Sequence, residues 1–289
     1  MLDRILTWAE SSSDIRAVAL IGSWARLDSP SDKWSDIDLI LVARDPVFYL
    51  SSTGWLADIE QFSICTVERA PTGEIRERRV LFGGGIDVDF VVLPVASCLQ
   101  GFQDAWIAGI ARQGMKVLLD KDDILPSLAP SPPSAQPARS PTLLEFQEVI
   151  ADFWYHVVWT AKKLRRGELW TAKRCCDVHM KGLLLRMVEW HARAITGWAL
   201  DVRHNGRFLE QWASPSVVAE LPQVFARYDE DDIWRALFAT SALFRRIAEE
   251  TARHLTYDCL AGQHQKAMAW AVKYQSESAK RFTSSRIGS

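Results

Sequence analysis

A proline-rich stretch near the middle of the chain divides it into two parts of different character. Residues 126–141 contain half of the twelve prolines in the sequence. Proline has no backbone N–H to donate and interrupts helices and strand ladders, so this stretch predicts an extended linker. We expect one domain at 1–125, a second at 142–276 and a flexible tail at 277–289. The six prolines are Pro126, Pro130, Pro132, Pro133, Pro137 and Pro141.

Strand and helix patterns alternate in the first part. Five apolar runs have the length of strands, and Gly83-Gly84-Gly85 between the last two indicates a hairpin. Helical spacing of apolar residues predicts helices at 2–10, around 47–59 and near 96–112, and 116–119 reads as a last short strand. The five runs are Ala17–Ile21, Ile37–Ala43, Phe62–Val67, Arg79–Phe82 and Ile86–Leu93. A mixed β-sheet with flanking helices is therefore expected.

The second part reads as helical from Thr142 onward. Thr142 and Glu145 have the spacing of a capping box and follow Pro141, which predicts a helix start. The candidate helices are 142–165, 168–196, 216–226, 230–254 and 260–276. The fold class is therefore α+β, with a sheet-containing N-terminal domain followed by a C-terminal α-helical bundle domain.

Bulk composition is that of a globular protein. Apolar residues make up 48% and charged residues 24% of the chain, and no apolar run reaches the roughly 18 residues of a membrane span. The N-terminus lacks the pattern of a signal peptide, so we expect a cytoplasmic protein, as a monomer or weak dimer. Five scattered cysteines indicate reduced thiols, and their spacing does not suggest a zinc site.

Charge is distributed unevenly along the chain. The first 125 residues carry a net charge of -7 and the remainder +5, which together give the -2 of the whole chain. An acidic first part does not suit a protein that wraps nucleic acid. It suits a protein that holds divalent cations or a polycationic small molecule.

Two aspartates at the start of an apolar run are the strongest chemical signal. Asp36 and Asp38 are two residues apart, so on a strand their side chains point to the same face. Adjacent carboxylates repel unless they are protonated or bind a metal, and Mg²⁺ prefers one or two carboxylates plus phosphate oxygens. Asp87 and Asp89 repeat the arrangement on a later strand. If the two strands are neighbours, a third carboxylate joins the first pair, as a metal ligand or as a general base.

Gly22 and Ser23 end the first strand of the chain. Glycine lets the backbone approach a phosphate closely, and the serine hydroxyl and amide can donate to it. Arg26 in the following turn can pair with a phosphate oxygen. Competing motifs are absent: there is no G-x-x-x-x-G-K-[ST], the Gly83–Gly85 run lacks dinucleotide spacing, and no two histidines have the spacing of helical metal ligands.

The order Gly22-Ser23, then Asp36-Ile37-Asp38, resembles the signature of the polymerase-β-like nucleotidyltransferase superfamily. More narrowly, the chain resembles the aminoglycoside 6-adenylyltransferase (streptomycin adenylyltransferase) family. The stretches that carry this resemblance are Trp55–Ile59, Ile86–Pro94, Asp152–Tyr155, Leu183–Trp190, Ile233–Phe238 and Leu243–Arg246. It implies a nucleotidyltransferase domain, a helical domain, and transfer of AMP from ATP to a streptomycin-like acceptor, with two Mg²⁺ ions.

The resemblance also implies roles for individual residues. In the family one aspartate stands four residues before Leu-Pro, and Asp89 matches it through Leu93-Pro94, so we prefer Asp89 to Asp87 as the third carboxylate. A basic residue on the long central helix contacts the nucleotide in the family. Lys181 fits that role. The sequence supports equally well the alternative that Lys181 is a solvated lysine on the protein surface.

A polycationic acceptor needs acidic groups beside aromatic or apolar walls. Asp152 beside Trp154, and Glu189 beside Trp190, offer such a pairing, although tryptophan at helical spacing is more often core. Two alternatives stay open. One is a nucleotidyltransferase acting on a lincosamide, a protein side chain or an RNA end, and the other is a non-catalytic nucleotide-binding module.

Overall fold

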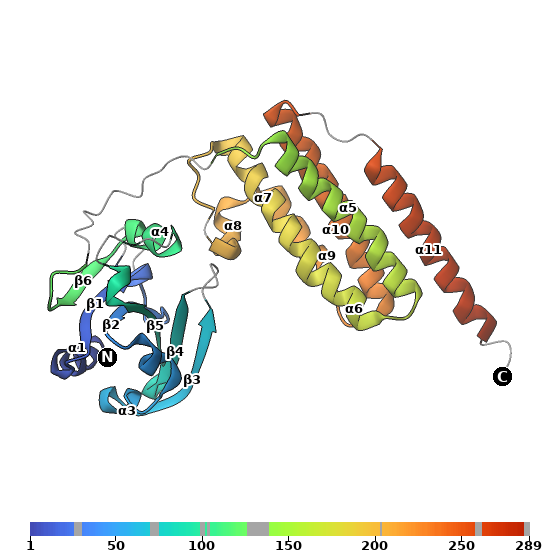
Figure 1. Cartoon of the computed structure of the whole chain (residues 1–289). Coiled ribbons are helices and arrows are strands. Elements are labelled where there is room, and N and C mark those ends of the chain that lie inside the picture. Colours follow the sequence, from blue (N-terminus) through green and yellow to red (C-terminus); the bar gives the residue numbers. More distant parts are fainter. Residues whose placement is uncertain are drawn as a thin grey trace. The chain divides into compact units, whose positions relative to one another are not determined.

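The computed structural model describes residues 1–25, 31–69, 75–98, 102, 105–125, 139–202, 204–257 and 262–285. The chain forms two compact units, Met1–Ala135 and Gln136–Ser289 (Figure 1). The first contains the sheet and the second is helical, so the expected α+β class is confirmed. The predicted domain, linker and tail boundaries stay predictions, and most of the proline-rich stretch lies outside the described residues.

A six-stranded mixed sheet forms the centre of the first unit, in the order β3-β4-β5-β2-β1-β6 (Figure 1). Its strands are β1 (Ile15–Ile21), β2 (Ile37–Ala43), β3 (Phe62–Arg69), β4 (Arg76–Phe82), β5 (Ile86–Pro94) and β6 (Lys116–Asp120). The parallel pair is β2 with β5, and the other neighbours run antiparallel. β2 and β5 are therefore neighbours, which is the arrangement that a three-carboxylate cluster requires.

Helices cover both faces of this sheet. One face packs on α1 (Leu2–Ser11), α2 (Pro46–Ser51) and α3 (Leu56–Ile59) through residues such as Leu39 and Phe90. The other face buries Ile40 and Val91 beside Ile107 of α4 (Ala105–Gln113). Because side chains alternate along a strand, Asp38 and Asp89 lie on the same face as Ile40 and Val91.

Of two features predicted for this unit, the hairpin is present and the single helix is not. The hairpin at Gly83–Gly85 is confirmed: β4 pairs antiparallel with β5 across it, and Gly84 has a φ of 74° that favours glycine. The single helix expected around 47–59 was wrong, because α2 stops at Ser51 and Ser52 is extended. The intervening sequence is Ser52-Thr53-Gly54, and these residues are poor helix formers.

The second unit contains only helices and turns among its described residues. Its helices are α5 (Leu143–Arg165), α6 (Leu169–Arg174), α7 (Met180–Thr196), α8 (Leu209–Trp212), α9 (Pro215–Val224), α10 (Glu230–Leu255) and α11 (Gln263–Ser285). The predicted capping box is confirmed, since Thr142 Oγ1 accepts from the amide of Glu145 and Glu145 accepts from the amide of Thr142. A π-helical turn, Cys175–His179, joins α6 to α7. None of the described helices has the length and apolar character that a membrane span requires.

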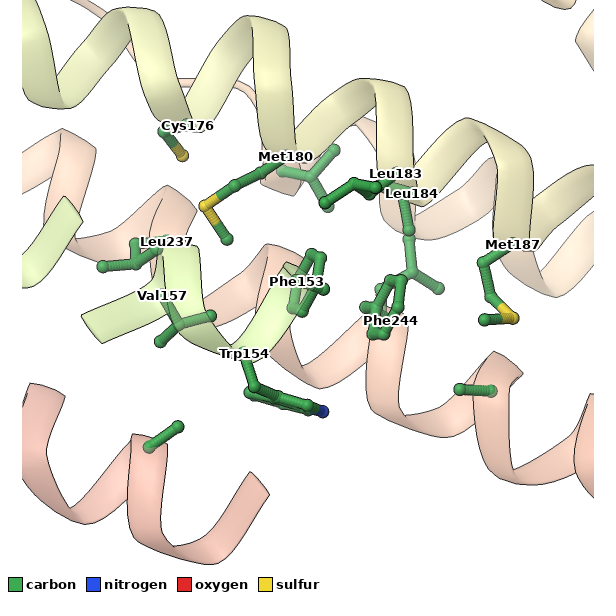
Figure 2. Close-up of a cluster of buried hydrophobic side chains, with 14 of the residues drawn as sticks. Phe153, Trp154, Val157, Cys176, Met180, Leu183, Leu184, Met187, Leu237 and Phe244 are labelled. Carbon is green, nitrogen blue, oxygen red and sulfur yellow. The ribbon is translucent and has the colours of Figure 1, made fainter. Parts of the chain in front are cut away.

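Aromatic and aliphatic side chains of α5, α7 and α10 form the core of the helical unit (Figure 2). Phe153 and Phe244 stack with ring centroids 3.6 Å apart, and Trp154 meets Phe244 edge to face. Four of the five cysteines are described and all four are free thiols, as predicted; Cys259 lies outside the described residues.

Replacing Phe244 with alanine is expected to lower the free energy of unfolding by about 3–5 kcal/mol, because the side chain is fully buried and leaves a cavity. Chemical denaturation monitored by circular dichroism measures this change. Phe208→Ala, at a half-exposed position in the same unit, is the matched control and should change stability much less. Equal losses in both variants would contradict this assignment of the core.

Candidate active site

Three carboxylates meet at one end of the β2–β5 pair. Asp38 of β2 lies directly opposite Asp89 of β5, and Asp36 stands two residues before Asp38. One oxygen from each of Asp36, Asp38 and Asp89 lies within 4.8 Å of the other two. The cluster runs from an exposed side chain at Asp36 to a buried one at Asp89. The structure therefore brings together the three aspartates that the sequence predicts as one cluster.

Burial and mutual repulsion disfavour negative charge in this cluster. Burial raises the pKa of Asp89 to about 7; Arg79 opposes that rise, and the charges of Asp87, Asp38 and Glu77 add to it. The pKa of Asp87 is also raised, first by burial and then by Asp36. A bound cation would relieve this repulsion, as it does wherever carboxylates share a site.

The two carboxylate oxygens of Asp89 differ in their contacts. Its Oδ2 lies 3.3 Å from Nε of Arg79, which stands opposite Asp89 on β4. Its Oδ1 is buried and has no hydrogen-bond partner. A buried carboxylate oxygen without a partner costs free energy unless a cation or a donor reaches it. The donor set, three carboxylates with one such oxygen, fits a hard cation such as Mg²⁺.

The backbone conformation and the close packing at position 22 require glycine. It begins the 3-10 turn Gly22–Trp24 directly after β1 and has a φ of 66°. A Cβ at this position would lie 2.0 Å from Oδ2 of Asp38, a contact that no side chain can make. The glycine thus lets the backbone pass beside the carboxylate cluster. Next to it, Ser23 Oγ is buried and has no hydrogen-bond partner, so it is a candidate donor to an anion at this turn.

Replacing Gly22 with alanine is expected to lower the nucleotidyl transfer that the sequence resemblance implies by about 100-fold, because the new methyl group displaces Asp38 by roughly an ångström or more. Initial rates of pyrophosphate release measure the loss. Gly84→Ala is the control, since its glycine also has a positive φ but a Cβ there meets open space. If Gly22→Ala kept wild-type rates, the close packing of this turn on Asp38 would be irrelevant to function.

Three further residues bear on the sequence predictions for this site. Arg26 lies outside the described residues. Asp87 is exposed and is not a member of the group formed by Asp36, Asp38 and Asp89. Arg79 was missed from the sequence, yet it forms ion pairs with Asp89, Glu77 and Glu68. Its position directly across from Asp89 in the β4–β5 hairpin was the available signal.

Comparison with known proteins finds a matching family and several similar proteins. The family model described as streptomycin adenylyltransferase matches residues 1–274. The chain belongs to this family. Aminoglycoside 6-adenylyltransferases of Bacillus subtilis and Campylobacter jejuni are each 25% identical to it, over 89% and 88% of this chain and 90% and 88% of their own lengths. A crystal structure of an aminoglycoside 6-adenyltransferase from Bacillus subtilis, 21% identical, covers 95% of this chain and 97% of its own with a TM-score of 0.46.

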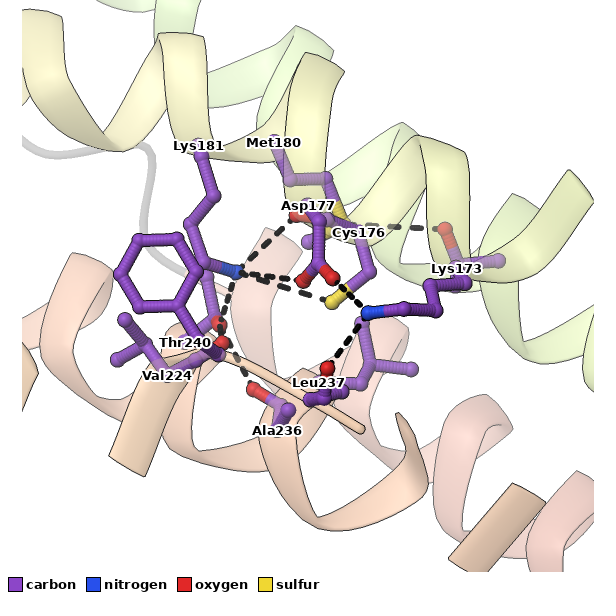
Figure 3. Close-up of polar contacts among 12 residues, drawn as sticks. Lys173, Cys176, Asp177, Met180, Lys181, Val224, Ala236, Leu237 and Thr240 are labelled. Carbon is purple, nitrogen blue, oxygen red and sulfur yellow. Dashed lines mark hydrogen bonds and ion pairs between the residues drawn. The ribbon is translucent and has the colours of Figure 1, made fainter. Parts of the chain in front are cut away.

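Lys181, which the streptomycin adenylyltransferase resemblance linked to the nucleotide, is not a solvated surface residue. Its ammonium donates to the carbonyl of Cys176 and to Thr240 Oγ1, at 3.0 and 2.9 Å, and lies 3.9 Å from Asp177 (Figure 3). Burial lowers its pKa. Asp177 also pairs with Lys173, so two lysines flank one carboxylate. Lys181 therefore packs within the helical unit, and a role in nucleotide binding stays a prediction.

The residues predicted to meet an acceptor have contrasting surroundings. Trp154 is 6% exposed and belongs to the helical core. Beside it, a hollow of about 380 Å³ between α5 and α11 carries Lys162 and Lys266, whose charge does not suit a polycation. Glu189 is half-buried on α7. Their acceptor contacts, like that of Asp152, stay predictions.

Asp152 contacts two histidines. His156 Nδ1 lies 2.7 Å from its Oδ1, and His179 Nε2 lies 3.2 Å from its Oδ2. Both histidines were missed from the sequence, because only histidine pairs on one helix were considered there. The aspartate and histidine at 152 and 156 are one turn apart on α5, whereas His179 reaches them from the π-helical turn.

A buried pair between α7 and α10 is expected to make stability depend on pH. His191 is 1% exposed and its Nε2 lies 2.6 Å from Glu250. Burial lowers the pKa of His191 below its ordinary value of 6.5. Burial acts to raise the pKa of Glu250, but hydrogen bonds from His191 and Arg246 outweigh it and hold that pKa below its ordinary value.

Stability is therefore expected to fall on acidification below about pH 6.5, because the unfolded chain takes up a proton that folded His191 resists. The contribution of Glu250 has the same sign and is lost at lower pH. Urea unfolding at pH 7.5 and 5.5 measures the effect, and His191→Gln should reduce the difference between the two values. His254→Gln, an exposed position on α10 whose charge makes only the smallest contribution to the lowered pKa of His191, should reduce the difference much less.

Proposed function

We propose that this protein transfers the adenylyl group of ATP to a hydroxyl group of an aminoglycoside, at the 6-position of a streptomycin-like acceptor, and releases pyrophosphate. One observation carries the proposal: the Asp36, Asp38 and Asp89 carboxylates converge within 4.8 Å in a chain that matches aminoglycoside 6-adenylyltransferases along nearly their whole length. Because ATP is the donor, we propose the cytoplasm as the place of action.

Asp36, Asp38 and Asp89 would hold two Mg²⁺ ions together with the nucleotide phosphates. When bound, magnesium would neutralise charge on the triphosphate and on the leaving pyrophosphate. Asp38 is central to this arrangement, because Gly22 packs against it on one side and Asp89 stands opposite it on the other. Asp38 and Asp89 are fixed by two paired strands and Asp36 directly precedes one of them, which orients the donor set before the nucleotide arrives.

The reaction exchanges one phosphorus–oxygen bond for another. The acceptor hydroxyl oxygen attacks the α-phosphorus, and the bond from that phosphorus to the pyrophosphate oxygen breaks. The hydroxyl proton needs an acceptor, and Asp89 Oδ1, buried and without a partner, is a candidate for it. Asp89 thus has two candidate roles, as a metal ligand or as a general base.

The remaining site residues would bind the two substrates. Ser23 Oγ and the backbone at Gly22 would donate to the triphosphate, with Arg26 and Lys181 as further nucleotide contacts. The net charge of -7 over the first 125 residues favours a polycationic acceptor over RNA. Asp152 and Glu189 are proposed as acceptor contacts, and Trp154 is left out of this set because it is buried in the helical core.

The direct test is pyrophosphate release from MgATP with a panel of aminoglycosides, starting with streptomycin. We expect release that requires both an aminoglycoside and the Asp38 carboxylate, and a product heavier by one adenylyl group in mass spectrometry. Release with a lincosamide, a protein or an RNA end in place of any aminoglycoside would redirect the acceptor assignment. Nucleotide binding without transfer to any acceptor would favour a non-catalytic module.

A further inference from the structure

We propose that Asp152, His156 and His179 form a binding site for a transition-metal ion of the Zn²⁺ class in the helical unit. This proposal assigns Asp152 to the metal ion instead of to the acceptor contact proposed above, and it does not depend on the adenylyl-transfer reaction. Its donor set, two imidazoles and one carboxylate, also differs in chemistry from the all-carboxylate cluster of Asp36, Asp38 and Asp89.

The three side chains converge from two helical segments. Asp152 and His156 are one turn apart on α5, so they project from the same face of that helix. His179 comes from the π-helical turn, and its ring centroid lies 4.0 Å from that of His156. One ligand atom from each of the three residues lies within 4.8 Å of the other two. The carboxylate therefore contacts both imidazoles, which also pack against each other.

The π-helical turn is the second observation that points to a site. Helical segments lie directly on either side of Cys175–His179, so the turn is a local change within a longer helix. An extra residue in a turn rotates the subsequent residues by roughly 100° relative to a regular helix. Cys176 and Met180 remain in the core, while His179 is directed to Asp152. π-Helical turns are uncommon in proteins, and many of those that occur lie at functional sites.

The distances suit a four-coordinate ion. Ligand atoms about 2.0–2.1 Å from a tetrahedral Zn²⁺ lie roughly 3.3 Å from one another. Nε2 of His179 lies 3.2 and 3.3 Å from the two carboxylate oxygens of Asp152. Nδ1 of His156 lies 2.7 Å from Oδ1 of Asp152 and donates to the backbone carbonyl of Asp152 at 2.9 Å. A cation that binds Nδ1 would replace this proton and open the contact with Oδ1 by roughly half an ångström.

The donor types and the access route narrow the choice of ion. Imidazole suits zinc, cobalt, nickel and copper, whereas magnesium and calcium prefer oxygen ligands alone. The side chains of Asp152 and His179 are 40% and 44% exposed, so an ion can reach the cluster from solvent. Three protein ligands leave a fourth position for water.

Titration of the untagged full-length protein with Co²⁺, without nucleotide or Mg²⁺, tests the proposal. We expect one equivalent to bind with the intense visible absorption of tetrahedral Co²⁺, distinct from the weak absorption of any Co²⁺ held by the carboxylate cluster, and Zn²⁺ to displace it. His156→Gln and His179→Gln should each weaken binding roughly 100-fold or more, since loss of even a supporting partner of a metal ligand costs 10–100-fold. Circular dichroism should show that both variants fold.

Two matched variants separate this site from other sources of metal binding. His254→Gln removes an exposed histidine on α10, and Asp36→Asn removes a member of the carboxylate cluster. Both should keep the affinity and the spectrum of the wild type. Equal binding by wild type and His179→Gln, or loss of binding in Asp36→Asn alone, would overturn the proposal. Because no substrate is present, neither result depends on whether the protein is an adenylyltransferase.

Discussion

Replacing Asp38 with alanine is expected to lower kcat for adenylyl transfer by at least about 1,000-fold, because metal-based charge stabilisation is worth several kcal/mol and each ~1.4 kcal/mol is a factor of ten. Asp38 lies opposite Asp89 and two residues from Asp36, so its loss removes the carboxylate that adjoins both of the others. Pyrophosphate release at saturating MgATP, with any aminoglycoside that the wild type modifies, measures the effect.

The same substitution is expected to leave the unfolding temperature unchanged or to raise it. Asp38 is half-buried beside Asp89, whose pKa its charge helps to raise, so removing that charge relieves repulsion in the folded state. Asp58→Ala is the matched control, because Asp58 is an exposed carboxylate on α3 of the same unit. Near-normal turnover by Asp38→Ala would refute its assignment as a ligand, and loss of turnover accompanied by unfolding would show a structural role instead.

The sequence was most informative where local pattern and pairing register coincide. Asp36 and Asp38 precede or open an apolar strand, and the acidic run at Asp87–Asp89 opens another, so the only missing fact was that β2 and β5 pair. The glycine at position 22 indicated that the backbone there approaches another group closely. The sequence did not show that this group is the carboxylate of Asp38. Such partners depend on how strands pair, which a period of two along each strand leaves undetermined.

The helical unit shows where pattern reasoning fails. Lys181 lies on an amphipathic helix, and its spacing alone does not distinguish a surface lysine from one that is buried against Asp177 and Thr240. His179 meets Asp152 because a π-helical turn changes the register between α6 and α7. A regular 3.6-residue period, which the prediction of one helix over 168–196 assumes, gives no sign of that change.

Arg79 illustrates the same limit in the sheet. On its own strand it reads as one of several charged residues near a solvent edge. The hairpin places it across from Asp89, where it also contacts Glu77 and Glu68. Because Arg79 holds only Oδ2 of Asp89, the chemistry available at Oδ1 depends on a residue from a neighbouring strand.

Replacing Asp89 with asparagine is expected to lower kcat by about 10²- to 10⁴-fold, the range for loss of a general base. The amide is nearly the same size as the carboxyl group, and Arg79 keeps Glu68 and Glu77 as partners, so the fold should persist. Asp87→Asn is the matched control: Asp87 shares strand and face with Asp89 but is exposed, and its variant should stay close to wild type. A greater loss in Asp87→Asn would reverse the choice between the two.

The dependence of the residual rate on Mg²⁺ separates the two roles open to Asp89. If Asp89 is a ligand, Asp89→Asn raises the Mg²⁺ concentration needed for half-maximal rate, and excess Mg²⁺ restores part of kcat. If it is the base, the Mg²⁺ dependence is unchanged and kcat stays low at every concentration. We expect either role to fall to Oδ1, the oxygen without a hydrogen-bond partner, because Oδ2 lies 3.3 Å from Nε of Arg79.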